Sequence, residues 1–299
     1  MYGHQTGDAV MMLGRNSTVV DDWSPADNPY AIALSEAQWW QRTAALAVRR
    51  IHADDEDGDP FFSSRQIDAR QLCIALHQLL VAEKLEQTAL KELGIDPAVG
   101  QALTQAREHF EATLPGVKHM RDGLTHFEDW SRGKGLGPQK ERRAARDEPR
   151  DVARAYSSFA YDPQADTVTM GPYQIDVGAV DEAAGALAYA IYLAAHEVDR
   201  RNTARFRTTV LRALTDAGIP CGPEKAVHVS AGDDGRVWLS LTPGGLDGEP
   251  ERQELAERTV AALTAAALRL AESMPLQPEE SVTRLVGWQS LRVEPAPSI

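Results

Sequence analysis

The segment SSRQIDARQLCIALHQLLVAEKLEQTALKELG, residues 63–94, is the strongest structural signal in this chain of 299 residues. Ser63, followed three positions later by Gln66, forms a capping-box pattern that predicts the start of a helix. Gly94 suits the position just after a last helical turn. Between these ends apolar side chains recur at helical spacing, at Ile67, Leu72, Leu76, Leu79 and Leu80. We therefore predict an amphipathic helix that reaches about residue 93.

Further helices are predicted on both sides of this segment. Ser35 and Gln38 repeat the capping-box pattern ahead of a helix that reaches about residue 51. Other helical patterns cover residues 97–114, 115–132 and 177–201, with a further helix from there to 217. Residues 157–175 alternate apolar and polar side chains around turn signals and predict a β-hairpin. Four long helices with a hairpin before the last one predict a helical bundle over residues 63–205.

The C-terminal third has a mixed pattern. Residues 226–241 predict a β-hairpin, and residues 251–274 predict a final Ala-rich helix. A short apolar patch and a loose tail are expected after residue 274. The predicted fold class is thus mainly α, with three regions: an N-terminal arm and helix at 1–62, the helical bundle at 63–205, and a small α+β part at 206–299.

Composition narrows the class of protein. Hydrophobic residues make up 43% and charged residues 25% of the chain, which is typical of a soluble globular protein and excludes a disordered or collagen-like one. The 44 acidic and 31 basic residues give a formal net charge of −13, which argues against broad nonspecific binding of nucleic acid or anionic lipid. Two cysteines cannot form a disulfide framework. The acidic residues 54–60 lack the spacing of a calcium-binding loop.

Targeting signals are not found in the sequence. The first residues have neither the basic nor the apolar region of a signal peptide. The longest apolar run, 183–195, is shorter than the roughly 18–20 residues needed to cross a bilayer. We therefore expect a cytoplasmic protein that has no contact with the membrane.

One short motif suggests chemistry. Arg121, Asp122 and His126 lie within six residues of a predicted helix. Histidine titrates near neutrality and can transfer a proton to or from a sugar hydroxyl, and arginine can bind a phosphate and stabilise its charge. Asp122 and His126 are four residues apart, so on a helix the carboxylate could orient the imidazole. This set of side chains suits cleavage of a phosphodiester.

The motif resembles that of the HEPN superfamily, helical bundles that carry an Arg-x(4–6)-His motif with a polar residue after the arginine. The resemblance covers about residues 63–205 and includes the hairpin before the last helix. It implies a metal-independent endoribonuclease without a cofactor, in which Arg121 binds phosphate, His126 acts as acid and base, and Asp122 supports them. It also implies a homodimer in which two motifs line one cleft, acting on RNA as a toxin or antiviral effector.

A basic stretch follows the motif. Residues 132–150 contain seven basic and three acidic residues, and we interpret them as a loop. If the resemblance holds, this loop follows the RNA backbone. The residues expected to contact RNA are Lys118 of the preceding helix and, in or next to the loop, Arg132, Lys134, Lys140, Arg142 and Arg143. The alternative is a solvated connection without a ligand.

Two other classes of function remain open. A metal could bind among facing helices, with ligands from His77, Glu83, Glu108, His109, His119, His126, His196 and Glu197, although the Glu-x-x-His spacing of di-iron bundles does not occur. The bundle could instead be a noncatalytic protein-binding module, such as a regulator or antitoxin-like subunit, in which Arg121 and His126 are solvated surface residues. The acidic net charge and the appended C-terminal part favour this class.

Overall fold

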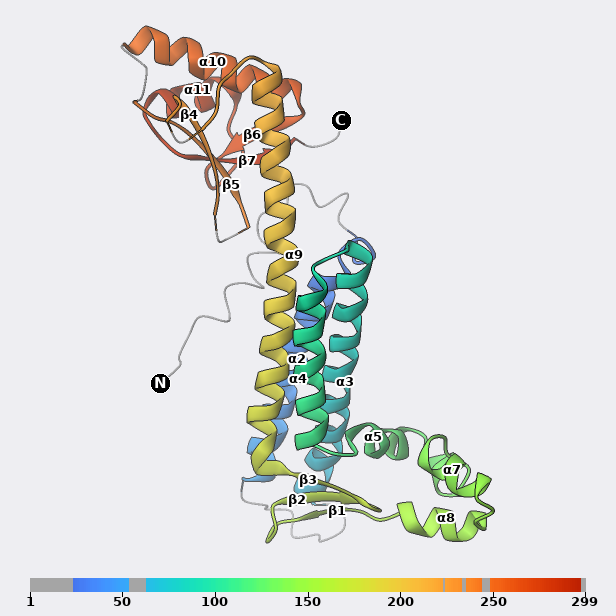
Figure 1. The fold of residues 1–299 in the computed structure, drawn as a ribbon. Coiled ribbons are helices and arrows are strands. Elements are labelled where there is room, and N and C mark those ends of the chain that lie inside the picture. Colours follow the sequence, from blue (N-terminus) through green and yellow to red (C-terminus); the bar gives the residue numbers. More distant parts are fainter. Residues whose placement is uncertain (1–23, 54–62, 223, 233–234, 244–247, 297–299) are drawn as a thin grey trace. The chain divides into compact units, whose positions relative to one another are not determined.

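The computed structural model describes residues 24–53, 63–222, 224–232, 235–243 and 248–296, and shows a mainly helical chain with small β-sheets (Figure 1). It divides into two compact units: a bundle unit, Pro25–His196, and a C-terminal unit that begins at Glu197. The acidic segment 54–60 and the N-terminal residues considered for a signal peptide lie outside the described residues.

The bundle unit is built on long helices. Helix α3 (Ser64–Leu93) contacts α2 (Pro29–Ile51) along its length, and also α4 (Pro97–Thr113). As predicted, the Ser63 side chain accepts a hydrogen bond from the Gln66 N–H at 3.4 Å, and Gly94 ends α3 in the left-handed conformation. Three of the predicted core side chains are fully buried, and Ile67 is exposed instead. The buried three are Leu72, Leu76 and Leu79.

Helix α2 begins seven residues earlier than predicted, with Asn28 rather than Ser35 at the N-cap. Asn28 and Pro29, which the sequence alone would place in a turn, instead form the N-cap position and the first residue of the helix. Proline is tolerated there because the first N–H groups of a helix have no partner within it. The predicted start of α4 is confirmed, since Asp96 accepts a hydrogen bond from the Ala98 N–H at 2.9 Å and Pro97 follows it.

The predicted helix at 115–132 is broken at His126. Helix α5 (Val117–Thr125) ends there, and the short α6 (Phe127–Trp130) follows. His126 has φ −115° and ψ 40°, outside the helical region. The break leaves Phe127 exposed and buries Trp130, whose ring meets that of Tyr156 edge to face at 5.7 Å. The apolar side chains of residues 117–130 therefore do not line one face of a single helix.

Residues 132–150 are not a loop, and this prediction was wrong. They contain α7 (Pro138–Ala144) and lead into α8 (Pro149–Tyr156). The fully buried Gln139 organises the turn before α7, since its side chain accepts from the Gly135 N–H at 2.8 Å and donates to the Trp130 carbonyl at 3.1 Å. A buried amide with both ends hydrogen-bonded fixes a chain segment whose composition alone suggests a solvated connection.

A three-stranded antiparallel sheet replaces the predicted hairpin at 157–175. Strands β1 (Phe159–Asp162), β2 (Thr167–Met170) and β3 (Tyr173–Asp176) are joined in that order. Hydrogen bonds and an ion pair attach the sheet to the long helices. Gln66 exchanges two hydrogen bonds with the Tyr161 backbone, and His52 at the end of α2 contacts the Asp166 carboxylate at 3.0 Å.

Helix α9 (Val180–Asp216) is one continuous helix, where the sequence analysis expected two. Residues 186–216 contain neither glycine nor proline, so nothing in this part of the sequence breaks the helix. Within the described residues, only the segment Val177–Asp216 is long and apolar enough to cross a membrane, judged by length and composition alone. A partly buried helix of this kind is compatible with a soluble protein.

The C-terminal unit is α+β. Its four-stranded antiparallel sheet has the order β4-β5-β7-β6, and helices α10 (Glu249–Ala265) and α11 (Pro278–Val286) share its core. The strands are β4 (Val227–Ala231), β5 (Val237–Leu241), β6 (Leu268–Ala271) and β7 (Leu291–Pro295). The predicted hairpin at 226–241 is confirmed by β4 and β5.

The predicted final helix at 251–274 is wrong in its second half. Helix α10 ends at Ala265, and Ala267 has φ 55°, which turns the chain into β6. Leu268 and Leu270 then alternate into the core. An alanine-rich composition favours helix, but here burial of two leucines on a strand prevails over that propensity. The expected tail instead contributes α11 and β7.

We predict that Gly133→Ala destabilises the bundle unit by about 2–4 kcal/mol. Gly133 has φ 66°, and a Cβ there would lie 2.1 Å from the Pro149 carbonyl oxygen, so the substitution adds a backbone clash to left-handed strain. Urea unfolding followed by tryptophan fluorescence measures the change. The control is Gly94→Ala, with φ 62° and no atom within 4 Å of the added Cβ, for which strain alone costs about 1 kcal/mol. Equal losses in the two variants would contradict this account.

Candidate functional site

Helix α5 is positioned by a tight start and a buried face. Gly116 precedes it with φ 84°, and a Cβ at Gly116 would lie 2.4 Å from the ring of Tyr173 on β3. Val117 and Met120 are buried, and the Cys73 Sγ of α3 lies 3.9 Å from the Met120 Sδ. With these side chains facing inward, Lys118 on the same helix is exposed, and Arg121 and Asp122 are partly exposed.

Arg121 is held from two sides. Its Nη2 donates a hydrogen bond to His77 Nε2 on α3 at 2.5 Å, and its Nη1 lies 3.0 Å from the Asp122 Oδ1. A quarter of the Arg121 side chain remains exposed, and the same holds for Asp122. A guanidinium fixed by two partners and still open to solvent can bind an anion with little loss of side-chain entropy.

His77 is a neutral acceptor in this contact. A guanidinium has no acceptor atom, so the His77 Nε2 accepts and the proton of the neutral ring is on Nδ1. The Nδ1 atom is buried and has no hydrogen-bond partner among the described residues. Burial first, and then the positive charge of Arg121, lower the pKa of His77 from 6.5 to about 4. The imidazole is therefore uncharged at neutral pH and supports the arginine next to it.

The sequence did not predict this role of His77. His77 was expected only as a possible metal ligand, since 44 positions separate it from Arg121 and no local spacing connects the two. The apolar periodicity of α3 did place His77 within a buried stretch. A histidine on a buried helical face needs a hydrogen-bond partner. Its position on that face was the one feature of the sequence that pointed to this contact.

His126 lies apart from the Arg121 contacts. It ends α5, its side chain is exposed, and its imidazole makes no hydrogen bond or ion pair within the described part of the chain. The expected contact between the Asp122 carboxylate and the His126 ring is not formed, because Asp122 pairs with Arg121. The two are joined only through the backbone, where the His126 N–H donates to the Asp122 carbonyl at 2.9 Å. One copy of the chain thus presents the two halves of the motif separately.

His119 occupies the inner side of the same helix. Its ring stacks on Tyr173 with centroids 5.0 Å apart, and a Cβ at Gly137 would lie 3.6 Å from its Cε1. Desolvation by this packing lowers the pKa of His119, opposed by the nearby Asp122 carboxylate. His119 therefore joins α5 to the sheet and to the start of α7.

The six residues predicted to contact RNA fall into two groups. Arg132 pairs with Asp129 at 2.7 Å, Arg142 pairs with Asp147 at 2.6 Å, and Arg143 donates to the Gly133 carbonyl at 2.6 Å. These three cations stabilise the turns around α6 and α7. The other three are exposed lysines whose side chains make no hydrogen bond or ion pair within the part of the chain that the structure describes: Lys118, Lys134 and Lys140.

The metal-site alternative finds no cluster in the described residues. No group of three or more His, Cys, Asp and Glu side chains comes together there in a way that could hold an ion. Of the eight candidate ligands, Glu83 is buried on α3, where burial raises the pKa of its carboxyl, and Glu108 and His109 are exposed on α4.

Comparison of the chain with protein-family models, with curated proteins and with solved structures finds no match.

We predict that His77 makes the stability of the bundle unit depend on pH. The folded-state pKa of about 4 lies below the unfolded-state value of 6.5, so the unfolded chain binds more protons in this window. Stability should therefore fall by as much as about 3 kcal/mol as the pH drops from 6.5 to 4. His77→Gln keeps an acceptor for Arg121 without the titration. Urea unfolding of both proteins across this range should show a shallower pH dependence in the variant, and identical slopes would refute the assignment.

Proposed function

We propose that the protein is a metal-independent endoribonuclease with a HEPN-type site on α5. The observation that carries this proposal is the Arg121 guanidinium, which His77 and Asp122 hold in place while a quarter of its side chain stays open. The exposed Lys118 lies one turn earlier on the same helix. Two cations at this spacing suit the binding of a phosphate group in an otherwise acidic protein.

The proposed reaction uses the ribose as nucleophile. The 2′-oxygen attacks the adjacent phosphorus, the bond from phosphorus to the 5′-oxygen breaks, and a 2′,3′-cyclic phosphate and a 5′-hydroxyl result. His126 is proposed to exchange protons with these oxygens, and its exposed, unpaired imidazole is compatible with that role. Arg121 would stabilise the charge that develops on the phosphate. The wider proposal includes a HEPN-type four-helix bundle, a cytoplasmic location and a toxin or antiviral effector role.

We predict that the purified protein cleaves RNA in the presence of EDTA, and that Arg121→Ala or His126→Ala lowers the rate by about 100-fold or more. The measurement is electrophoresis of labelled RNA with identification of the cyclic-phosphate ends. The matched control is His109→Ala, an exposed histidine on α4 that should leave cleavage unchanged. Intact RNA with the wild-type protein, or equal cleavage by wild type and the His126 variant, would reject the proposed function.

We further predict that the active form is a homodimer in which Arg121 of one copy acts with His126 of the other, since the two side chains make no hydrogen bond within one copy. Mixing the inactive Arg121→Ala and His126→Ala proteins should restore part of the activity, because mixed dimers contain one intact pair. Light scattering at micromolar concentration should give twice the chain mass. A monomer that cleaves RNA, or a mixture as inactive as its components, would exclude a shared site.

A second candidate is a noncatalytic protein-binding module. It is favoured by exposed apolar side chains on the bundle part of α9, where Tyr189 is 61% and Leu193 48% exposed. Tyr189 also stacks on Tyr192, with ring centroids 6.0 Å apart. The RNA assay separates the two candidates, because a binding module leaves RNA intact with or without the Arg121 and His126 substitutions.

A further inference from the structure

Helices α10 and α11 of the C-terminal unit line a groove of about 740 Å³ that is open to solvent. Val260 and Val282 form its buried floor, and the small Ala261 and Ala265 line its α10 side. Its charged lining residues are two glutamates, Glu257 of α10 and Glu279 of α11. The groove therefore combines an apolar floor with an acidic rim.

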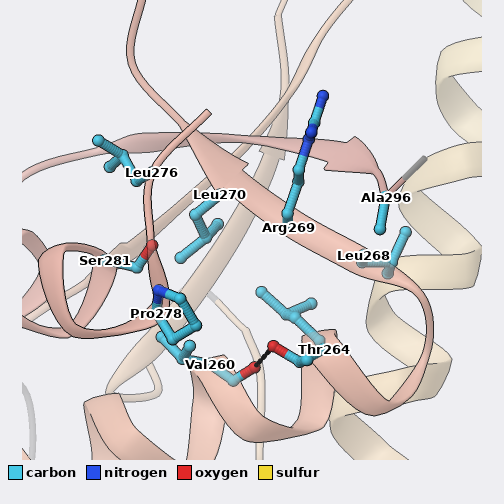
Figure 2. A pocket seen from close by; sticks show the side chains of 10 residues that line it. Val260, Thr264, Leu268, Arg269, Leu270, Leu276, Pro278, Ser281 and Ala296 are labelled. Atoms are coloured by element: carbon cyan, nitrogen blue, oxygen red, sulfur yellow. Dashed lines mark hydrogen bonds between the residues drawn. The ribbon is translucent and has the colours of Figure 1, made fainter. Parts of the chain in front are cut away.

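A smaller cavity of about 140 Å³ adjoins the groove (Figure 2). The two share Val260, Thr264 and Pro278 in their walls. The lining is largely aliphatic, from Val260, Leu263, Leu268, Leu270 and Leu276. The Thr264 hydroxyl donates to the Val260 carbonyl at 2.9 Å and is therefore satisfied within the helix.

Arg269 is the one charged residue that lines the cavity, but its guanidinium does not make the cavity polar. Arg269 points away from the other lining side chains in Figure 2, and its Nη2 lies 3.4 Å from the Glu294 Oε2. Apolar cavities of about 150 Å³ in proteins stay dry and accept a group the size of benzene. The cavity thus has the size and character to accept one large apolar side chain.

We propose that α10 and α11 bind an amphipathic helical segment of another protein, with one apolar side chain in the cavity and lysine or arginine residues opposite Glu257 and Glu279. The small Ala261 and Ala265 allow the backbone of a helix to approach closely, as in helix-in-groove recognition. The two rim carboxylates select for positive charge beside the apolar stripe. This proposal stands independently of the proposed RNA cleavage, since it uses residues of the C-terminal unit alone.

The test uses the full chain and a fluorescein-labelled peptide of 18 residues, composed of Leu, Lys, Ala and Gln, with leucines at helical spacing. A peptide of the same composition with scrambled leucines controls for charge alone. Fluorescence anisotropy should show that the patterned peptide binds about tenfold or more tightly than the scrambled one. Hydrogen exchange should show protection at α10 and α11. Equal binding of both peptides, or protection elsewhere, would overturn the proposal.

Two pairs of variants test the two features of the site. The double variant Glu257→Lys, Glu279→Lys should weaken peptide binding about tenfold or more. The control is the double variant Glu182→Lys, Glu254→Lys, which changes the net charge by the same amount at residues that do not line the groove. Its affinity for the peptide should be unchanged. Ser281→Leu should block the cavity, and Ser281→Ala should leave it open. If Ser281→Leu does not fold by circular dichroism, the charge pairs decide. Equal affinities for the two charge-reversed proteins would overturn the proposal.

Discussion

The contact between Arg121 and His77 depends on the burial of one face of α3. Leu72, Leu76 and Leu79 of that face are fully buried and fix the rotation of the helix about its axis. His77 is also buried, and α5 packs against this part of α3. An imidazole in this position needs a hydrogen-bond partner, and Arg121 supplies it. The packing of apolar side chains thus determines where the guanidinium is held.

The electrostatics of the bundle unit follow from the same arrangement. A neutral histidine beside an arginine leaves the positive charge of the arginine undiminished, and Asp122 on the solvent side offsets part of it. Three of the cations that follow α5 are used within the protein, on carboxylates and carbonyls. Only a small part of the positive charge around α5 is then available to a ligand, and it is concentrated near Arg121 and the exposed lysines.

The two units offer different kinds of surface. The exposed polar groups of α5 suit an anion, whereas α10 and α11 present an apolar groove with acidic edges. The proposed nuclease site lies in the bundle unit and the proposed peptide-binding groove in the C-terminal unit. The two proposals rest on separate residues, so either can fail without the other.

Sequence patterns predicted the elements whose signals are local. The capping residues of α3 and α4, the long apolar periodicity of α3 and the hairpin of β4 and β5 each depend on residues a few positions apart. The sequence placed Arg121 and His126 within one helix at 115–132, whereas in the structure Arg121 lies on α5 and His126 follows its last residue. The sequence did not locate α7, β6 or the break at His126, because burial of Gln139, Leu268, Leu270 and Trp130 prevailed over local composition.

The sequence could not identify His77 as the partner of Arg121, for a related reason. His77 lies 44 positions away, and only the crossing of α3 and α5 brings the two side chains to 2.5 Å. The groove between α10 and α11 likewise depends on how two helices rest on one sheet. The sequence by itself determined where α3 and α4 begin and where the β4–β5 hairpin lies, because capping, periodicity and turn signals act over a few residues. The tertiary structure alone decided which polar groups meet, because contacts between distant elements depend on how their apolar faces pack.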